Sequence, residues 1–268
     1  MDPVMKGRAE GDVEMDAVGT HMMTGCLRRM LFALAASLFS AGCAAPLTIP
    51  IATVWYEQPA AAAHALLIVY LPGNGDKSEA FERHGLLESL RNSGVPADVV
   101  GVNAVLGYYT NGSIFQRLED DVIKPAKTKG YERIWLVGNS LGGYGALAYL
   151  GGHKNEIAGV VLLGPFVGDR EPIEAIMKMG GLRNWDPGQI DPTDWKKKLL
   201  LLLKDYDQHR DAYPPVYLGF GSFDKFAVSQ RFLAEVLPKD RVIELSGGHE
   251  WWTWSKAWKQ FMEKGIMK

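Results

Sequence analysis

The 268-residue chain has little cysteine, no long apolar run and almost no excess charge. Its two cysteines, Cys26 and Cys43, both lie near the start, so the rest of the chain forms no internal disulfide and depends on an apolar core. The net charge of −2 argues against a nucleic-acid-binding surface. No stretch reaches the roughly 18 apolar residues of a membrane-spanning helix. What remains, with 47% hydrophobic and 22% charged residues, is typical of a single globular domain.

The segment before the globular part has the layout of a targeting signal. Arg28 and Arg29 precede an apolar run over 30–39, and the small residues Ser40, Ala41 and Gly42 follow. The segment resembles a bacterial lipoprotein signal, in which cleavage precedes a cysteine that is then lipidated, here Cys43. We therefore expect residues 1–42 to be a signal segment and 43–60 a tether, with export to the bacterial cell envelope and a lipid-anchored protein.

Two other interpretations of this segment stay open. A plain secretory signal cut near Ala45 would give a periplasmic or secreted protein, and an uncleaved signal would itself be the anchor. Residues 1–21 fit none of these signals, because they carry five acids where a signal is basic: Asp2, Glu10, Asp12, Glu14 and Asp16. We expect an over-extended start, with Met22 or Met23 as the true first residue.

Residues 61–268 alternate between apolar runs of strand length and segments with helical spacing. Strands are expected at 51–56 (an edge strand), 65–71, 97–102, 132–138, 157–164, 215–221 and 241–245. Helices are expected at 78–94, 113–130, 140–150, 226–237 and 252–264. Apolar strands that alternate with helices predict an α/β fold with a mostly parallel sheet covered on both faces. Residues 165–213 interrupt the alternation with two weaker helical patterns, and we expect them to form a small cap-like insert.

One strand-to-helix junction carries a catalytic signature. Gly138-Asn139-Ser140-Leu141-Gly142 is a G-x-S-x-G element, whose sharp turn exposes a serine hydroxyl above the sheet while its glycines leave room for the helix. A phosphate-binding loop fits less well, because Tyr144 stands where such a loop has lysine. With this nucleophile elbow the chain resembles the α/β-hydrolase family of serine esterases and lipases.

The resemblance implies that a histidine and an acid follow Ser140 along the chain. His249 follows the last expected strand in "GGHEWW", which is similar to the C-terminal histidine motif of esterase-D-like members. His153 is expected at the end of the elbow helix and His209 in the insert, so both fit less well. His249 and Glu250 form no zinc motif, because Thr253 stands where the second histidine would be.

The acid is expected just after the strand at 215–221, where Asp224 lies 25 residues before His249. A carboxylate there would accept the imidazole N–H and stabilise the imidazolium that forms during attack. Asp211 precedes that strand, and Glu250 adjoins the histidine too closely to orient it. An aspartate after a strand is also commonly a helix N-cap.

The oxyanion that forms during acyl transfer needs hydrogen-bond donors. The residue after the nucleophile, Leu141, would supply one backbone N–H. The second would come from the loop "LPGNGD" at 71–76, where the resemblance favours Asn74 over Gly75. Pro72 replaces the histidine that usually begins this loop in the family.

These residues predict a serine hydrolase that cleaves a carboxylic ester through an acyl-enzyme, with no metal and no organic cofactor. The expected partner is a small ester or acyl substrate. An acyltransferase, a thioesterase or an amidase would use the same triad, and a non-catalytic envelope binding protein would keep the fold alone. Several aromatic residues are expected either to line a substrate pocket or to pack in the core: Tyr108, Tyr109, Trp185, Trp251, Trp252 and Trp254.

Overall fold

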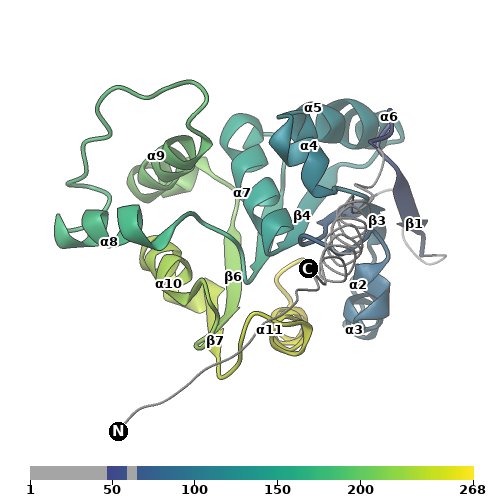
Figure 1. Ribbon diagram of the computed structural model, residues 1–268. Helices are drawn as coiled ribbons and strands as arrows, with labels where there is room; N and C mark the ends of the chain where they lie inside the picture. Colours follow the sequence, from purple (N-terminus) through teal and green to yellow (C-terminus); the bar gives the residue numbers. More distant parts are fainter. Residues whose placement is uncertain (1–46, 59–64) are drawn as a thin grey trace, which may run out of the picture. The chain divides into compact units, whose positions relative to one another are not determined.

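The computed structural model describes residues 47–58 and 65–268 (Figure 1). The expectations for residues 1–42, for Cys43 and for the start of translation lie outside the described residues. Among the residues that are described, no helix is both long enough and apolar enough to cross a membrane.

A seven-stranded sheet forms the centre of the fold, in the order β1-β3-β2-β4-β5-β6-β7. β1 is antiparallel to β3, and the other neighbouring pairs are parallel, which confirms the predicted α/β class and mostly parallel sheet. The strands are β1 (Thr53–Tyr56), β2 (Leu66–Leu71), β3 (Asp98–Val102), β4 (Arg133–Asn139), β5 (Gly159–Leu163), β6 (Val216–Gly221) and β7 (Val242–Leu245). β1 lies at the sheet edge, so the sheet begins within the segment expected to be a tether.

Helices cover both faces of the sheet (Figure 1). One face packs against α2 (Ala80–Arg83), α3 (Leu86–Asn92) and α11 (Trp251–Glu263). The other packs against α4 (Leu106–Thr110), α5 (Ile114–Leu118), α6 (Lys124–Thr128), α7 (Leu141–His153), α8 (Arg170–Lys178), α9 (Trp195–Gln208) and α10 (Ala227–Val236). Successive residues of β2 point to opposite faces of the sheet. Leu67 and Val69 pack in the core on the α7 side, and Ile68 and Tyr70 pack in the core on the α11 side.

Three local features differ from the sequence expectation. The helix expected over 78–94 is broken at Gly85, whose φ of 76° is easily adopted only by glycine, and it becomes α2 and α3. The helix expected over 113–130 passes through a wider π turn at Glu119–Ile123, just before Pro125. Proline has no N–H for the Asp121 carbonyl four residues earlier, which accounts for the irregular turn. Helix α4 is too short to show a periodic pattern and was not expected.

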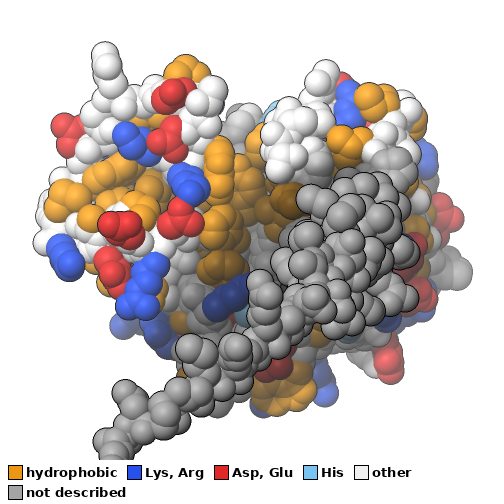
Figure 2. Space-filling model, in the orientation of Figure 1, with side chains coloured by type: hydrophobic (Ala, Val, Ile, Leu, Met, Phe, Trp, Pro, Cys, Tyr) orange, Lys and Arg blue, Asp and Glu red, His pale blue; other side chains and the backbone are white. Residues whose placement is uncertain are grey.

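The insert between β5 and β6 contains α8 and α9, where the two weaker helical patterns lie. Helix α9 buries Leu199, Leu200 and Leu203 and packs against α7 and α10. An ion pair between Arg183 and Asp207 ties the linking segment to α9. Figure 2 shows hydrophobic side chains gathered on the side of the molecule that carries α8, α9 and α10.

Candidate active site

Ser140 stands in a strained turn between β4 and α7. Its φ of 50° and ψ of −115° make it the only non-glycine residue with positive φ in the described part of the chain. A Cβ on Gly138 would overlap the carbonyl of Gly142, and a Cβ on Gly142 would overlap the carbonyl of Leu71. The two flanking glycines are therefore required by close backbone approach, which is the reason inferred for them from the motif.

The three side chains singled out in the sequence come together at one edge of the sheet. His249 Nε2 lies 2.9 Å from Ser140 Oγ, and His249 Nδ1 lies 2.8 Å from Asp224 Oδ2. Ser140 follows β4, Asp224 follows β6 and His249 follows β7. The carboxyl ends of parallel strands meet at the same sheet edge, so residues 109 positions apart are brought into contact.

The hydrogen bonds define one arrangement of protons. A carboxylate only accepts, so His249 Nδ1–H donates to Asp224 and Nε2 is left to accept from the Ser140 hydroxyl. The Asp224 side chain is fully buried, and its other oxygen accepts the Phe226 N–H at 2.8 Å. Both carboxylate oxygens are thus occupied, which holds the aspartate in the orientation that faces the imidazole.

Two aromatic rings pack edge-on against the imidazole of His249. The Phe226 ring lies 5.0 Å away at an angle of 89°, and the Trp254 ring lies 4.9 Å away at 87°. Trp254 is almost completely buried. These rings limit rotation of the imidazole about its side-chain bonds and keep Nε2 directed at Ser140.

The rival histidines and acids pair with other groups or lie in solvent. His153 Nδ1 is 3.0 Å from Glu156, and His209 Nδ1 is 2.9 Å from Asp205. Asp211 is exposed. Glu250 is exposed as well, and it accepts the Gly248 N–H at 3.2 Å.

The loop after β2 turns beside Ser140. The Asp76 N–H donates to the Gly73 carbonyl at 3.1 Å, and Gly75 has a φ of 87°, so residues 73–76 form a tight turn. A Cβ on Gly73 would lie 3.2 Å from Ser140 Cβ. Asn74, the expected oxyanion donor, follows Gly73 and is exposed. Leu141 begins α7, where a backbone N–H has no partner within the helix.

Asn139 connects this loop to the turn that carries Ser140, a role that the G-x-S-x-G motif does not reveal. Its fully buried side chain accepts the Tyr70 hydroxyl at 2.8 Å and the Gly73 N–H at 3.0 Å, and it donates to Asp76 Oδ2 at 3.4 Å. Burial raises the pKa of Tyr70 well above its ordinary value, so this hydroxyl stays a neutral donor. One signal in the sequence is available: Asn139 is a polar residue directly after the apolar run of the strand.

The aromatic residues expected at a pocket or in the core have different environments. Trp254 alone among them contacts His249, while Trp251 stacks on His84 at 3.9 Å and Tyr109 packs on Tyr144 at 6.2 Å. Tyr108 and Trp185 are buried in the core, and Trp252 is exposed.

One group of side chains in the described residues has ligand atoms close enough for a metal ion: Glu119, His153 and Glu156. It lies at the far end of α7 from Ser140. Its carboxylates already pair with the Tyr149 hydroxyl, Lys124 and Lys127. Competing cations and a competing donor thus occupy the oxygens that a metal would need.

Comparison with known proteins places the geometry in a wider group. A family model described as alpha/beta hydrolase fold matches residues 109–249, more than half of the chain. No curated protein sequence matches. Among solved structures, the chain is similar to the fluorophosphonate-binding serine hydrolase F of Staphylococcus aureus, with a TM-score of 0.56, 15% identity, and 81% of this chain and 99% of that chain covered.

Two further solved structures share the fold. The S-formylglutathione hydrolase of Staphylococcus aureus has a TM-score of 0.53 and 14% identity, with 81% of this chain and 96% of that chain covered. The monoacylglycerol lipase of Paleococcus ferrophilus has a TM-score of 0.51 and 17% identity, with 81% of this chain and 98% of that chain covered. With its sheet order, its strained turn at Ser140 and the family match over residues 109–249, the chain belongs to the alpha/beta hydrolase family.

Proposed function

We propose that this protein is a serine hydrolase that cleaves a carboxylic ester through an acyl-enzyme intermediate. The observation that carries the proposal is the continuous hydrogen-bond relay from Ser140 through His249 to Asp224. A hydroxyl alone is a weak nucleophile, and it becomes effective when a base of this kind accepts its proton during attack.

The first half of the reaction forms the acyl-enzyme. Ser140 Oγ attacks the ester carbonyl carbon while its proton passes to His249 Nε2. The carbonyl oxygen becomes an oxyanion that accepts hydrogen bonds from the backbone N–H groups of Leu141 and Asn74. When the oxyanion collapses, the carbon–oxygen bond to the alcohol breaks, and His249 returns the proton to the departing alkoxide.

The second half repeats these steps with water. A water molecule attacks the acyl carbon, and His249 takes one of its protons. The bond between the acyl carbon and Ser140 Oγ then breaks, with the proton returning to the serine and a carboxylic acid leaving. Asp224 stays ionised throughout and stabilises the imidazolium that forms in both halves.

Labelling with a fluorophosphonate tests the nucleophile. Ser140 Oγ would displace fluoride from phosphorus and lose its proton, so the full chain should gain the mass of the probe less hydrogen fluoride at Ser140, while Ser140→Ala should not. Ester hydrolysis tests the reaction, with p-nitrophenyl acetate and butyrate as substrates. Turnover by the wild type that falls at least about a thousandfold in Ser140→Ala supports the proposal. Equal rates for the two proteins would contradict it.

We also propose that Cys43 carries a lipid and that the protein is anchored in the bacterial cell envelope. This rests on the signal-like segment that ends at Cys43, which lies outside the described residues. Mass spectrometry of the protein from a bacterial host should find residues 1–42 removed and a diacylglyceryl group on Cys43. Cys43→Ser should lack both changes, and an unmodified Cys43 in the exported wild type would contradict the proposal.

A further inference from the structure

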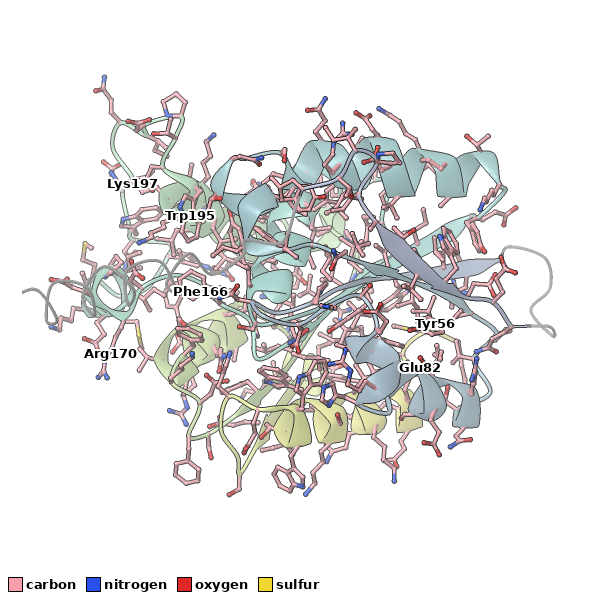
Figure 3. The ribbon with its side chains drawn as sticks, turned by 45° about the vertical axis from the view of Figure 1, so that its right-hand side comes forward. Tyr56, Glu82, Phe166, Arg170, Trp195 and Lys197 are labelled. Carbon is pink, nitrogen blue, oxygen red and sulfur yellow. The ribbon has the colours of Figure 1, made fainter. Side chains whose placement is uncertain are left out.

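A row of aromatic rings extends from the candidate base to the insert. The ring of Phe226 packs on His249 at 5.0 Å, and the ring of Phe166 packs on Phe226 at 5.1 Å. Trp195 of α9 follows at 5.9 Å from Phe166, and Tyr144 of α7 lies 4.8 Å from Trp195. Figure 3 shows Phe166 and Trp195 on the same side of the sheet, the first on the loop after β5 and the second on the insert.

The middle of this row is fixed to the nucleophile turn. The Phe166 N–H donates to the Ser140 carbonyl at 2.9 Å, so the Phe166 backbone adjoins the serine directly. Tyr144 lies one helical turn after Ser140, and its own N–H donates to the same carbonyl at 3.2 Å. Phe166 and Tyr144 are thus both attached through their backbones to the residue that would carry the acyl group.

Beyond Tyr144 the rings lead into a groove of about 460 Å³ between α7 and α9. Apolar side chains supply most of its lining, which includes Phe115, Tyr144, Ala148, Trp195, Leu199 and Leu202. From Tyr144 to Gly151, also in the lining, α7 rises by about 10 Å, since each helical residue adds 1.5 Å. Trp195 is 37% exposed, which is unusual for so large an apolar ring.

Two charged residues belong to the groove lining. The Lys198 side chain is exposed, and the Asp205 carboxylate already accepts from the Tyr213 hydroxyl and pairs with His209. The Tyr144 hydroxyl makes no hydrogen bond among the described residues, but the lining holds no buried charge and is mostly apolar. It suits a flexible hydrocarbon chain.

We propose that this groove binds the acyl chain of the ester substrate, and that the chain is an aliphatic one of medium to long length. The proposal rests on the proposed ester hydrolysis at Ser140. The direction of the groove decides between the two halves of an ester. His249 returns its proton to the alcohol, so the alcohol lies at the His249 end of the row. Tyr144, at the opposite end of the row, belongs to the groove lining, so the acyl half that stays bound to Ser140 would extend toward the groove.

The chain length of the ester then controls the rate. Burial of one methylene is worth up to about a fourfold gain in kcat/KM, so p-nitrophenyl octanoate should exceed the acetate at least tenfold. The test compares this octanoate-to-acetate ratio among variants of the full chain.

Two substitutions change the groove in opposite directions. Ala148→Phe places a ring inside the groove, and we expect it to lower the octanoate-to-acetate ratio at least tenfold. Leu202→Ala removes a side chain that packs against Gly151, the last α7 residue of the lining, and we expect it to lengthen the groove and raise the ratio of dodecanoate to octanoate. Ala175→Phe is the matched control, because it adds the same ring at an exposed position of α8 outside the groove, and it should leave all ratios unchanged.

Fatty-acid binding to an inactive variant tests the acyl site independently of the proposed ester hydrolysis. Decanoate should bind to the Ser140→Ala protein and change the fluorescence of Trp195, and this binding should weaken at least tenfold when Ala148→Phe is added. If no ester is hydrolysed but this pattern holds, the reaction is wrong and the acyl site stands. If folded Ala148→Phe and Leu202→Ala proteins keep the wild-type ratios and the wild-type affinity for decanoate, the groove is not the acyl site.

Discussion

The side-chain oxygen of Asn139 accepts a hydrogen bond from the backbone N–H of Gly73 at 3.0 Å. Asn139 immediately precedes the candidate nucleophile, and Gly73 immediately precedes the candidate oxyanion donor Asn74. One buried amide thus fixes the spacing between the group that attacks and a group that would stabilise the resulting charge. The Tyr70 hydroxyl donates to the same oxygen at 2.8 Å, which completes its acceptor capacity.

Asn139→Ala should lower both stability and activity. The substitution leaves the Tyr70 hydroxyl and the Gly73 N–H without their acceptor, and each buried unsatisfied donor costs about 1–3 kcal/mol. The loop with Asn74 then loses its attachment, and we expect kcat/KM on p-nitrophenyl butyrate to fall about tenfold to a hundredfold, since a whole oxyanion donor is worth about a hundredfold or more.

Exchanging Asn139 and Asp76 for each other's side-chain types tests whether a loss of activity comes from a displaced loop or from an unfolded protein. Asn139→Asp keeps an acceptor for Tyr70 and Gly73 but places a carboxylate where the amide donates to Asp76 at 3.4 Å. Like charges repel at that distance. Adding Asp76→Asn removes the repulsion, so the double variant should regain activity that Asn139→Asp loses. A folded Asn139→Ala protein with wild-type kcat/KM would show that the loop needs no such attachment.

The strain at Ser140 should appear as a difference between two inactive variants. Both Ser140→Ala and Ser140→Gly remove the hydroxyl and its bond to His249. Only glycine adopts a φ of 50° with a ψ of −115° without steric cost, and strain of this kind is worth about 1–3 kcal/mol. Ser140→Gly should therefore be more stable than Ser140→Ala by about 1 kcal/mol in urea unfolding. A Ser140→Ala protein that is the more stable of the two would show that the turn is not strained.

Asp224→Asn should reduce kcat about ten-thousandfold while the fold is kept. In the wild type, Asp224 accepts the Phe226 N–H at 2.8 Å, and the amide oxygen of the variant can accept the same bond. The amide NH₂ then faces His249 Nδ1 and favours the imidazole tautomer that cannot accept the Ser140 proton. The matched control is Glu250→Gln, which also exchanges a carboxylate for an amide near His249 and should leave kcat unchanged. A similar loss in both variants would mean that charge near the histidine, rather than its orientation, is what matters.

Much of this arrangement was predictable because parallel strands place their ends together. Ser140, Asp224 and His249 each follow a predicted strand, so their position at one sheet edge follows from the parallel topology. The sheet class follows from apolar runs that alternate with helical patterns, and the family match agrees with it.

Other parts depend on contacts that no local pattern encodes. Tyr144 and Trp195 come together only because the insert folds back over α7, and the insert has weak periodicity. The role of Asn139 depends on a glycine 66 residues earlier. The break at Gly85 was missed because the apolar spacing continues through it, and the backbone conformation of a glycine is not visible in its neighbours.

His84 should make the protein less stable in mild acid. Its ring stacks on Trp251 at 3.9 Å, and burial lowers its pKa below 6.5, with Arg83 acting in the same direction and Asp76 in the opposite one. A histidine whose pKa is lower in the folded state binds its proton more readily when unfolded. Its contribution to stability is therefore complete above the unfolded pKa of about 6.5 and is lost as the pH falls toward the folded value.

His84→Phe keeps a ring against Trp251 and removes the titration. Acidification from pH 7.5 to 5.5 should lower the urea midpoint of the wild type more than that of His84→Phe. NMR titration of the His84 ring should give a pKa below 6.5. An equal drop in both midpoints would show that the pKa of His84 is the same in the folded and the unfolded chain.

Two glycines near and within α7 should respond to the same substitution with opposite signs. A Cβ on Gly138 would overlap the carbonyl of Gly142, and backbone on both sides prevents either from moving away. Gly138→Ala should therefore destabilise the protein by about 3 kcal/mol or more, or prevent folding. A Cβ on Gly152, near the end of α7, would meet no heavy atom within 4 Å, so Gly152→Ala should stabilise the protein by about 0.5–1 kcal/mol. Since the chemical change is identical, thermal unfolding of the two variants isolates the effect of close backbone approach at the Ser140 turn. A Gly138→Ala protein with wild-type thermal stability would mean that β4 and α7 are not held together there.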